Sequence, residues 1–382
     1  MIGLNTEGDR AMRHARATIR PIVRTRHAVM VVVAGILAGL LILPSSAQAK
    51  RITLRIGSGH PAGPSVYATM MRDYFEPEVK RRVKERTAHE INFVEGYGGS
   101  IAKVAETLEA VQYGILDIGG YCVCFEPAKL FLHNFSYYVP FGPQESELAI
   151  GVARKVYDSH PWLAEQFTKK YGQTLLALNG WDNYHLGTVK PWNTVADLKG
   201  IKIGGAGPNL PWLKYAKAIP VQSTLPDGYM AMQTGVYAGW LMYPSAYYSY
   251  KFYEPAPYYT LIGFGVMGGA VVVTINDRTL KRLPPEVRAI IFEVARDYER
   301  EAAKALNERQ IQGLADLKKA GAVIRHLPED VRRSWAESLK DFPNEMAKEA
   351  DKRGMPGSEV IRAYIKEVSA NGYKWPVDYV IK

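Results

Sequence analysis

Cysteine and histidine are scarce in this sequence, and the residue patterns of common catalytic sites are missing. The 382 residues include two Cys and eight His. The pair His89-Glu90 is not followed by a second His at the spacing that places two metal ligands on one helix face. Neither G-x-S-x-G nor G-x-x-x-x-G-K-[ST] occurs, so a positioned nucleophile and a phosphate cradle are lacking. We therefore expect no enzyme, no cofactor and no metal site.

The two cysteines, Cys122 and Cys124, are separated by one residue. Export would permit a disulfide between them. A Cys-x-Cys bridge closes a small, strained ring, however, so we expect two thiols at the end of a strand. Without a nearby His, the pair cannot complete a tetrahedral zinc site.

A dense run of Lys and Arg is also absent from the body of the chain, although the formal net charge is +10. The closest approach to such a run is 80–86, which predicts the solvated face of a helix, so no nucleic-acid partner is expected. A hydrophobic content of 47% and a charged content of 23% are ordinary for soluble globular proteins. The length is sufficient for two domains.

The N-terminus has the pattern of a secretory signal peptide. Six Arg residues lie between positions 10 and 26, followed by an apolar stretch over 28–43 and small residues up to Ala49. A membrane anchor is the alternative, but the apolar stretch is short for a span of ~20 residues. We expect cleavage after Ala49 and a mature chain free in the periplasm.

Strand patterns alternate with helical patterns along the mature chain, which predicts βαβ units and an α/β fold. The apolar run 270–275 predicts a strand that is buried on both faces. After Pro284 and Pro285, apolar residues repeat at helical spacing to about position 319, which predicts a helix long enough to brace two domains. The other predicted strands are 51–57, 91–94, 114–119, 174–178 and 201–203, and the other predicted helices are 65–86, 100–113, 209–218, 226–234 and polar helices within 328–369.

Aromatic residues are concentrated in 237–259. Ten of the 23 residues there are Trp, Tyr or Phe. Such rings give large contact areas with few rotors, which suits an apolar pocket with a few polar contacts. We expect more than half of these rings to pack in the core, since the interior of a ligand cleft needs only three or four.

The chain resembles the substrate-binding subunit of tripartite ATP-independent periplasmic (TRAP) transporters, the DctP-like family. The resemblance covers nearly all of the mature chain and depends on the order of several short motifs. These motifs are 98–99, 108–117, 140–141, 181–183, 197–203, 231–236, 250–254 and 283–287.

This resemblance implies a two-lobed periplasmic-binding-protein fold (type II-like) with mixed sheets, a long bracing helix and a ligand cleft between the lobes. We expect one lobe from 50–180 with about 263–320, and the other from about 181–262. Residues 321–382 are expected to form helices that pack across both lobes. No linker separates the lobes, so we expect strands to cross between them at a hinge.

Family members mostly bind organic acids through an Arg directly after the strand that ends in Lys-Ile. Here that position is Gly204, and a second common Arg is missing near Tyr184 and His185. A glycine-rich backbone nest over 204–207, supplemented by Tyr184 or a protonated His185, is one replacement. The alternative is that the glycines only permit close approach of the two lobes. A neutral or aromatic ligand would then stack on Tyr and Trp rings.

The resemblance implies capture of a small organic solute and its delivery to a TRAP permease by a protein that we expect to be monomeric. Missing Arg residues and clustered rings favour an aromatic or otherwise apolar monocarboxylate. The alternatives are a ligand-sensing partner of a membrane receptor and, less well supported, a secreted enzyme on the same scaffold. The candidate ligand contacts are Gly59, His60, Tyr97, Tyr121, Trp181, Asn183, Tyr184, His185, Gly204, Gly205, Asn209, Trp212, Met242 and Tyr243.

Overall fold

The first of two β-sheets, called sheet A here, forms from strands that are far apart in the sequence. The computed structural model describes residues 49–223 and 225–382, so the predicted signal peptide up to Gln48 lies outside the described residues. The strand order is β2-β1-β3-β10-β4. β1 is parallel to β2 and β3, whereas β10 is antiparallel to β3 and β4. The bounds are β1 (Arg51–Gly57), β2 (Glu90–Gly96), β3 (Ile118–Cys122), β4 (Gln173–Trp181) and β10 (Met267–Asn276).

The second sheet, called sheet B, has the strand order β11-β9-β5-β8-β6-β7. It is also mixed, because β5 is antiparallel to β8 and β9 whereas β6 is parallel to β7 and β8. β11 joins it from the segment in which the sequence predicted only helices. The bounds are β5 (His185–Thr188), β6 (Lys202–Gly205), β7 (Ile219–Gln222), β8 (Gly239–Met242), β9 (Tyr258–Leu261) and β11 (Val323–His326).

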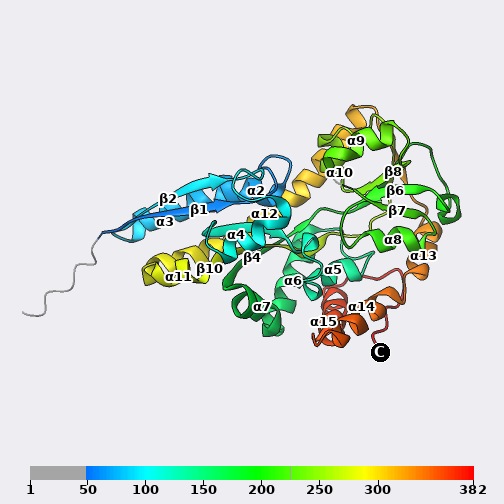
Figure 1. Cartoon of the computed structure of the whole chain (residues 1–382). Coiled ribbons are helices and arrows are strands. Elements are labelled where there is room, and N and C mark those ends of the chain that lie inside the picture. The colour runs from blue at the N-terminus through cyan, green and yellow to red at the C-terminus, as the bar shows by residue number, and fades with distance from the viewer. Residues whose placement is uncertain (1–48, 224) are drawn as a thin grey trace, which may run out of the picture. The chain divides into compact units, whose positions relative to one another are not determined.

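Helices flank both sheets, and Figure 1 shows α2, α3 and α4 beside the strands of sheet A and α8, α9 and α10 beside those of sheet B. The predicted helix 65–86 is helical throughout but contains a π-helical turn, η1. The bounds are α2 (Val66–Met70), η1 (Met71–Phe75), α3 (Glu76–Arg86), α4 (Thr107–Gln112), α5 (Phe135–Tyr138), α6 (Ser146–Ser159), α7 (Pro161–Tyr171), α8 (Leu210–Tyr215), α9 (Leu225–Gln233), α10 (Pro244–Ser249), α11 (Asp277–Arg282), α13 (Glu329–Ser338), α14 (Phe342–Lys352) and α15 (Gly357–Ala370).

The predicted long helix is confirmed as α12 (Pro285–Lys319), with 35 residues. Proline suits the first position of a helix, because a backbone N–H at that position would have no partner within the helix. The buried face includes Val287, Ile291, Val294 and Tyr298. α12 packs against α2, α3 and β4 on the side of sheet A and against α10 on the side of sheet B. α12 therefore contacts elements on the side of sheet A and elements on the side of sheet B.

Between β4 and β5, and again between β9 and β10, the chain passes from one sheet to the other. The two crossing segments, 182–184 and 262–266, are hydrogen-bonded to each other. The Tyr184 N–H donates to the Gly265 carbonyl over 3.4 Å, and the Phe264 N–H donates to the Tyr184 carbonyl over 3.2 Å. The Gly265 N–H also donates to Asn183 Oδ1 over 2.9 Å. This paired connection fits the expected hinge, although the predicted lobe boundaries stay a prediction.

β3 begins four residues later than the predicted strand 114–119. The cause is Gly114, which has a φ of 74° after the last turn of α4. Glycine adopts this left-handed conformation without steric cost and ends helices for that reason. The Ile115 N–H then bonds back to the Ala110 carbonyl, so the chain stays in the helix end until Ile118.

The expectation of two free thiols is wrong, because Cys122 and Cys124 form a disulfide. Cys122 ends β3, and Cys124 lies in the 3₁₀ turn η3 (Val123–Phe125). In an extended strand, Cα atoms two residues apart are separated by about 6.5 Å. That spacing is near the upper limit for a disulfide, and the turn brings these two Cα atoms to 5.1 Å, well inside the usual range. The sequence reasoning assumed a strand where the chain turns.

Glu76 is a buried carboxyl at the start of α3, with 1% of its surface exposed. Tyr97 donates its hydroxyl to Glu76 Oε1 over 2.8 Å. Burial raises the pKa of Glu76 from 4.5 to about 7, against the lowering effect of the Tyr97 hydrogen bond. Tyr97, a candidate ligand contact, therefore has a structural partner in the sheet A region.

We predict that Glu76→Gln makes stability less dependent on pH. Between pH 4.5 and 7 the folded state holds a proton on Glu76 that the unfolded chain releases, so the stability of the parent falls as pH rises through this window. The Gln variant keeps an acceptor for Tyr97 and does not ionise. It should match the parent near pH 4.5 and exceed it by about 3 kcal/mol at pH 8 in urea denaturation. The exposed Glu337→Gln serves as control, and an equal difference at both pH values would contradict the assignment.

Candidate ligand-binding site

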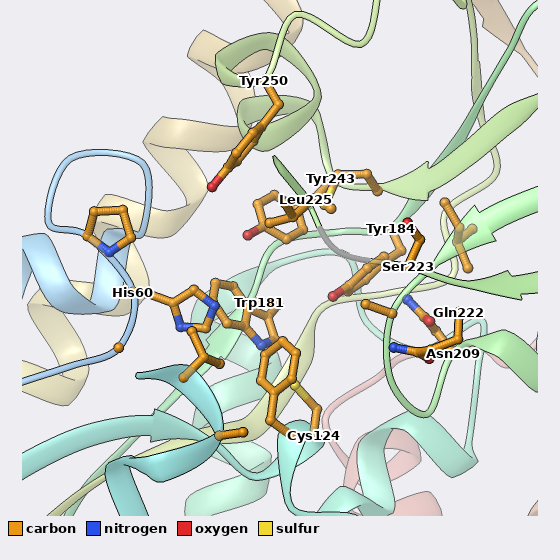
Figure 2. A pocket seen from close by; sticks show the side chains of 18 residues that line it. His60, Cys124, Trp181, Tyr184, Asn209, Gln222, Ser223, Leu225, Tyr243 and Tyr250 are labelled. Atoms are coloured by element: carbon orange, nitrogen blue, oxygen red, sulfur yellow. The ribbon is translucent and has the colours of Figure 1, made fainter. Parts of the chain in front are cut away.

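A cavity of about 460 Å³ lies where strands of both sheets end (Figure 2). His60 follows β1, Trp181 ends β4, and Tyr243 follows β8. Crevices at the carboxyl ends of strands are the usual ligand sites of open α/β sheets. The lining residues are Gly59, His60, Pro61, Val104, Ala105, Cys124, Phe125, Trp181, Tyr184, Ala206, Asn209, Gln222, Ser223, Leu225, Leu241, Met242, Tyr243 and Tyr250.

Aromatic rings from both sheets meet in the wall of this cavity. Trp181 of sheet A and Tyr243 of sheet B are stacked, with ring centroids 5.6 Å apart and an angle of 16° between the planes. Tyr184, from the crossing segment, meets Tyr243 edge-on at 5.5 Å. These contacts give the cavity a flat apolar surface, to which an aromatic or aliphatic group can bind.

Polar side chains gather on one side of the cavity, where Figure 2 shows Asn209, Gln222 and Ser223 close together. Asn209 is 1% exposed, and its Oδ1 has no hydrogen-bond partner among the described residues. Gln222 Oε1 accepts the Gly207 N–H over 3.4 Å, which leaves the Gln222 NH₂ group free to donate. We call this group of three side chains the amide side.

His60 lies on the other side of the rings in Figure 2. Its Nδ1 is 2.8 Å from the Tyr67 hydroxyl. Its ring packs against Trp181 at 5.2 Å and Phe125 at 5.6 Å. Burial lowers the pKa of His60 to about 4, so the imidazole is neutral at physiological pH.

The lining contains no Lys, Arg, Asp or Glu. With His60 neutral, the cavity therefore offers hydrogen bonds and apolar contacts but no opposite charge to a ligand. Within 49–223 and 225–382, no group of three His, Cys, Asp or Glu side chains is arranged to hold a metal ion. The same ranges contain no helix with the length and apolar composition needed to cross a bilayer.

The cavity brings together half of the candidate contacts: Gly59, His60, Trp181, Tyr184, Asn209, Met242 and Tyr243. The others lie outside its lining: Tyr97, Tyr121, Asn183, His185, Gly204, Gly205 and Trp212. Several of them have partners within the protein. The Tyr121 hydroxyl donates to Gln173 over 2.9 Å, and the Trp212 indole donates to the Tyr137 carbonyl over 3.0 Å. Contact of any of these residues with a ligand stays a prediction.

The backbone nest suggested for the glycine run is not formed at its first two residues. Gly204 and Gly205 are the last residues of β6, where Gly204 is in register with Val221 on one side and Trp240 on the other. A nest needs alternating right- and left-handed residues. Within 204–207 only Gly207 has a left-handed φ, of 83°. The chain continues as a strand where the sequence predicted a loop.

The suggestion that a protonated His185 supplements an anion site is also wrong. His185 Nδ1 accepts the N–H groups of Ile262 over 3.0 Å and Gly263 over 3.1 Å, so this nitrogen carries no proton. Burial lowers the pKa of His185 to about 3. The side chain links β5 to the crossing segment 262–266. As a neutral group, it offers no positive charge to an anion.

Of the remaining lining residues, the sequence pointed only to Ala206, within the suggested nest, and to Tyr250, within the aromatic-rich segment, and it predicted neither as a ligand contact. Gln222 and Ser223 were missed because β7 was not predicted, and Phe125 because the disulfide turn was not. Of the ten aromatic residues in 237–259, only Tyr243 and Tyr250 line the cavity. Six are buried, Tyr243 among them, so five of the ten rings pack in the core away from the cavity.

Gly204 permits close packing, and we predict that Gly204→Ala destabilises the protein. An added Cβ would lie 2.5 Å from Trp240 Cε3 and 2.8 Å from Tyr237 Cε2, and both rings are buried. Overpacking of this kind costs about 1–3 kcal/mol. In α6, Gly151→Ala meets nothing within 4 Å and should be neutral or stabilising by up to ~1 kcal/mol. Thermal unfolding of both variants tests this, and equal melting temperatures would contradict it.

The structure has two mixed β-sheets flanked by helices and joined by paired crossing segments, with a cavity at the strand ends. This architecture defines a two-lobed binding protein for a small solute. Comparison with known proteins agrees: the chain belongs to the bacterial extracellular solute-binding protein family 7 (DctP), whose model matches residues 73–350. A solute-binding protein from Sulfitobacter sp. (strain NAS-14.1) is 26% identical over 159 residues, which are 40% of this chain and 48% of that protein. The chain thus matches about half the length of this curated relative.

Solved structures of TRAP periplasmic solute-binding proteins share the fold. One from a marine metagenome, specific for aromatic acids and complexed with 3-hydroxybenzoate, has a TM-score of 0.75 and 18% identity over 85% of this chain and 99% of that chain. One from Rhodoferax ferrireducens with benzoate has a TM-score of 0.71 and 18% identity, covering 84% and 98%. The Bordetella pertussis protein DctP6, which binds pyroglutamic acid, has a TM-score of 0.70 and 19% identity, covering 82% and 99%.

Proposed function

We propose that this protein captures a small aromatic or apolar monocarboxylate in the cavity and delivers it to the membrane permease of a TRAP transporter. The observation that carries the proposal is the composition of the cavity: rings from both sheets form its wall, and uncharged hydrogen-bonding groups gather at the amide side. Such a cavity suits a ligand with one polar end and one apolar body.

The amide side supplies donors for a single carboxylate. The NH₂ groups of Asn209 and Gln222 can donate, and the Ser223 hydroxyl lies 3.2 Å from Tyr237 and can turn toward a ligand. Hydrogen bonds to an ionised acceptor are about twice as strong as neutral ones. Several such bonds favour the charged form of a carboxylate even without a cation.

A second carboxylate on the ligand would lie among rings without an opposite charge. Burying an unpaired charge costs far more than burying a neutral group. We therefore favour a monocarboxylate over a dicarboxylate. Two of the proteins with the same fold bind aromatic acids, which supports this ligand class.

Delivery requires that the bound protein differ from the empty one. The two sheets are connected by the crossing segments and by α12 with β11, so a rotation about the crossing segments would open or shut the cavity. A ligand that contacts Trp181 from one sheet and Tyr243 from the other favours the shut form. We propose that the permease recognises this form, that the protein acts in the periplasm after cleavage at Ala49, and that it catalyses no reaction.

The proposal is tested by a ligand panel in thermal-shift and calorimetric titrations of the purified protein. Bound ligand raises the melting temperature by mass action. We expect benzoate, phenylacetate and their hydroxylated analogues to bind, and succinate and glucuronate to bind at least tenfold more weakly. Tighter binding of succinate or glucuronate would reject the monocarboxylate. Failure of every organic acid to bind would reject the carrier role.

Tyr250→Leu should weaken binding of the aromatic acids about fivefold, because a ring contact with the ligand contributes about 1 kcal/mol. Tyr250 lines the cavity. Tyr248→Leu is the matched control, since Tyr248 lies outside the lining and stacks on Tyr253 at 5.8 Å. Calorimetric titration measures both variants. An equal loss of affinity in the two would exclude Tyr250 as a ligand contact.

A further inference from the structure

Three buried side chains beside the cavity form one hydrogen-bonded chain. The Ser58 hydroxyl is 2.6 Å from the Tyr67 hydroxyl, and the Tyr67 hydroxyl is 2.8 Å from His60 Nδ1. The backbone N–H of His60 donates to Ser58 Oγ over 3.0 Å. Ser58 and Tyr67 are buried, so neither exchanges these partners for water.

The direction in which these hydroxyl groups donate follows from the acceptors that are available to their hydrogens. Ser58 Oγ already accepts the His60 N–H, and among the described residues the only acceptor in reach of the Ser58 hydrogen is the Tyr67 hydroxyl. When Ser58 donates to Tyr67, the Tyr67 hydrogen is free to donate to His60 Nδ1. In the reverse direction the Ser58 hydrogen would be buried without an acceptor, which costs about 1–3 kcal/mol. The forward direction is favoured, and it leaves the imidazole proton on Nε2.

The Nε2–H group of His60 has no partner among the described residues, and His60 belongs to the cavity lining. Figure 2 shows it across the rings of Trp181 and Tyr243 from the amide side. Rings surround it, so it acts as a single neutral donor in apolar surroundings. A carboxylate needs several donors and is better served at the amide side.

We infer that His60 is a specificity-determining residue whose Nε2–H donates to an oxygen on the ligand, at the end opposite the carboxylate. This inference rests on the proposed function and narrows the ligand class to aromatic monocarboxylates that carry a ring hydroxyl or a similar oxygen acceptor. An unsubstituted ring would cover His60 and leave its N–H unpaired. Ser58 and Tyr67 are positioning residues, because they act through the His60 tautomer.

The test is a cycle of two proteins and two ligands. Phenylacetate and its 3- and 4-hydroxy derivatives are titrated calorimetrically against the parent protein and His60→Leu. The parent should bind the better hydroxylated acid roughly tenfold more tightly than phenylacetate, which is the effect of one additional buried hydrogen bond. In His60→Leu this preference should fall to about one, while the affinity for phenylacetate changes little.

The hydrogen-bonded chain of Ser58, Tyr67 and His60 is tested through Tyr67→Phe, which removes the hydroxyl that fixes the tautomer of His60. The preference for the hydroxylated acid should fall about threefold. Tyr157→Phe is the matched control: it also removes a buried hydroxyl that lies 2.8 Å from a histidine Nδ1, that of His133, but both residues are outside the cavity lining. ¹⁵N NMR of the His60 imidazole in the unliganded parent protein should show the proton on Nε2.

An unchanged hydroxyl preference in His60→Leu would overturn the inference, as would a proton on Nδ1 in the parent. If His60→Leu does not fold, Tyr67→Phe and the NMR measurement decide the question. These outcomes differ from failure of the proposed function, in which the parent binds none of the three acids. Binding of phenylacetate without a preference for either hydroxylated acid would leave the carrier role intact and reject only the role of His60.

Discussion

The proposed site depends on one constraint: in the cavity between the two sheets, no charged side chain is among the described residues of the lining, so a polar ligand group would have to be held by uncharged groups. Charge neutralisation is unavailable, so selectivity must come from the placement of uncharged donors relative to rings. Asn209 shows this most clearly, because its buried Oδ1 lacks a hydrogen-bond donor among the described residues. Leaving this acceptor unpaired is unfavourable, and a bound ligand that donates a hydrogen bond to it gains accordingly.

Buried polar groups around the cavity hold the rings in place. His185 and Asn183 were considered as ligand contacts, yet both bind backbone N–H groups of the crossing segment 262–266. These bonds fix Tyr184 at the boundary of the two sheets, where it meets Tyr243. Buried hydrogen bonds of this kind rigidify a core and favour one arrangement. The residues that position the ligand site are therefore distinct from those that line it.

The parts of the fold that the sequence predicted well are those with a strong local pattern. β10 is buried along its whole length, and α12 ends at Lys319, close to the predicted position. The short strands β7, β8 and β11 have four residues each, too few for a periodic pattern to be distinguished from a loop. Gln222 and Ser223 were missed with β7, and the disulfide was missed because a turn follows β3. The site was predictable at strand ends that were recognised, as for His60 and Trp181, and also at Met242 and Tyr243 in the aromatic-rich segment, although β8 itself was not predicted.

The most direct test of the account is a crystal structure of the protein with 3-hydroxybenzoate bound. We expect the ligand ring to lie against Trp181 and Tyr243, with its carboxylate within hydrogen-bonding distance of Asn209 and Gln222 and no Lys or Arg nitrogen within 4 Å. A carboxylate paired with a Lys or Arg side chain, or a ligand bound outside the cavity, would contradict it.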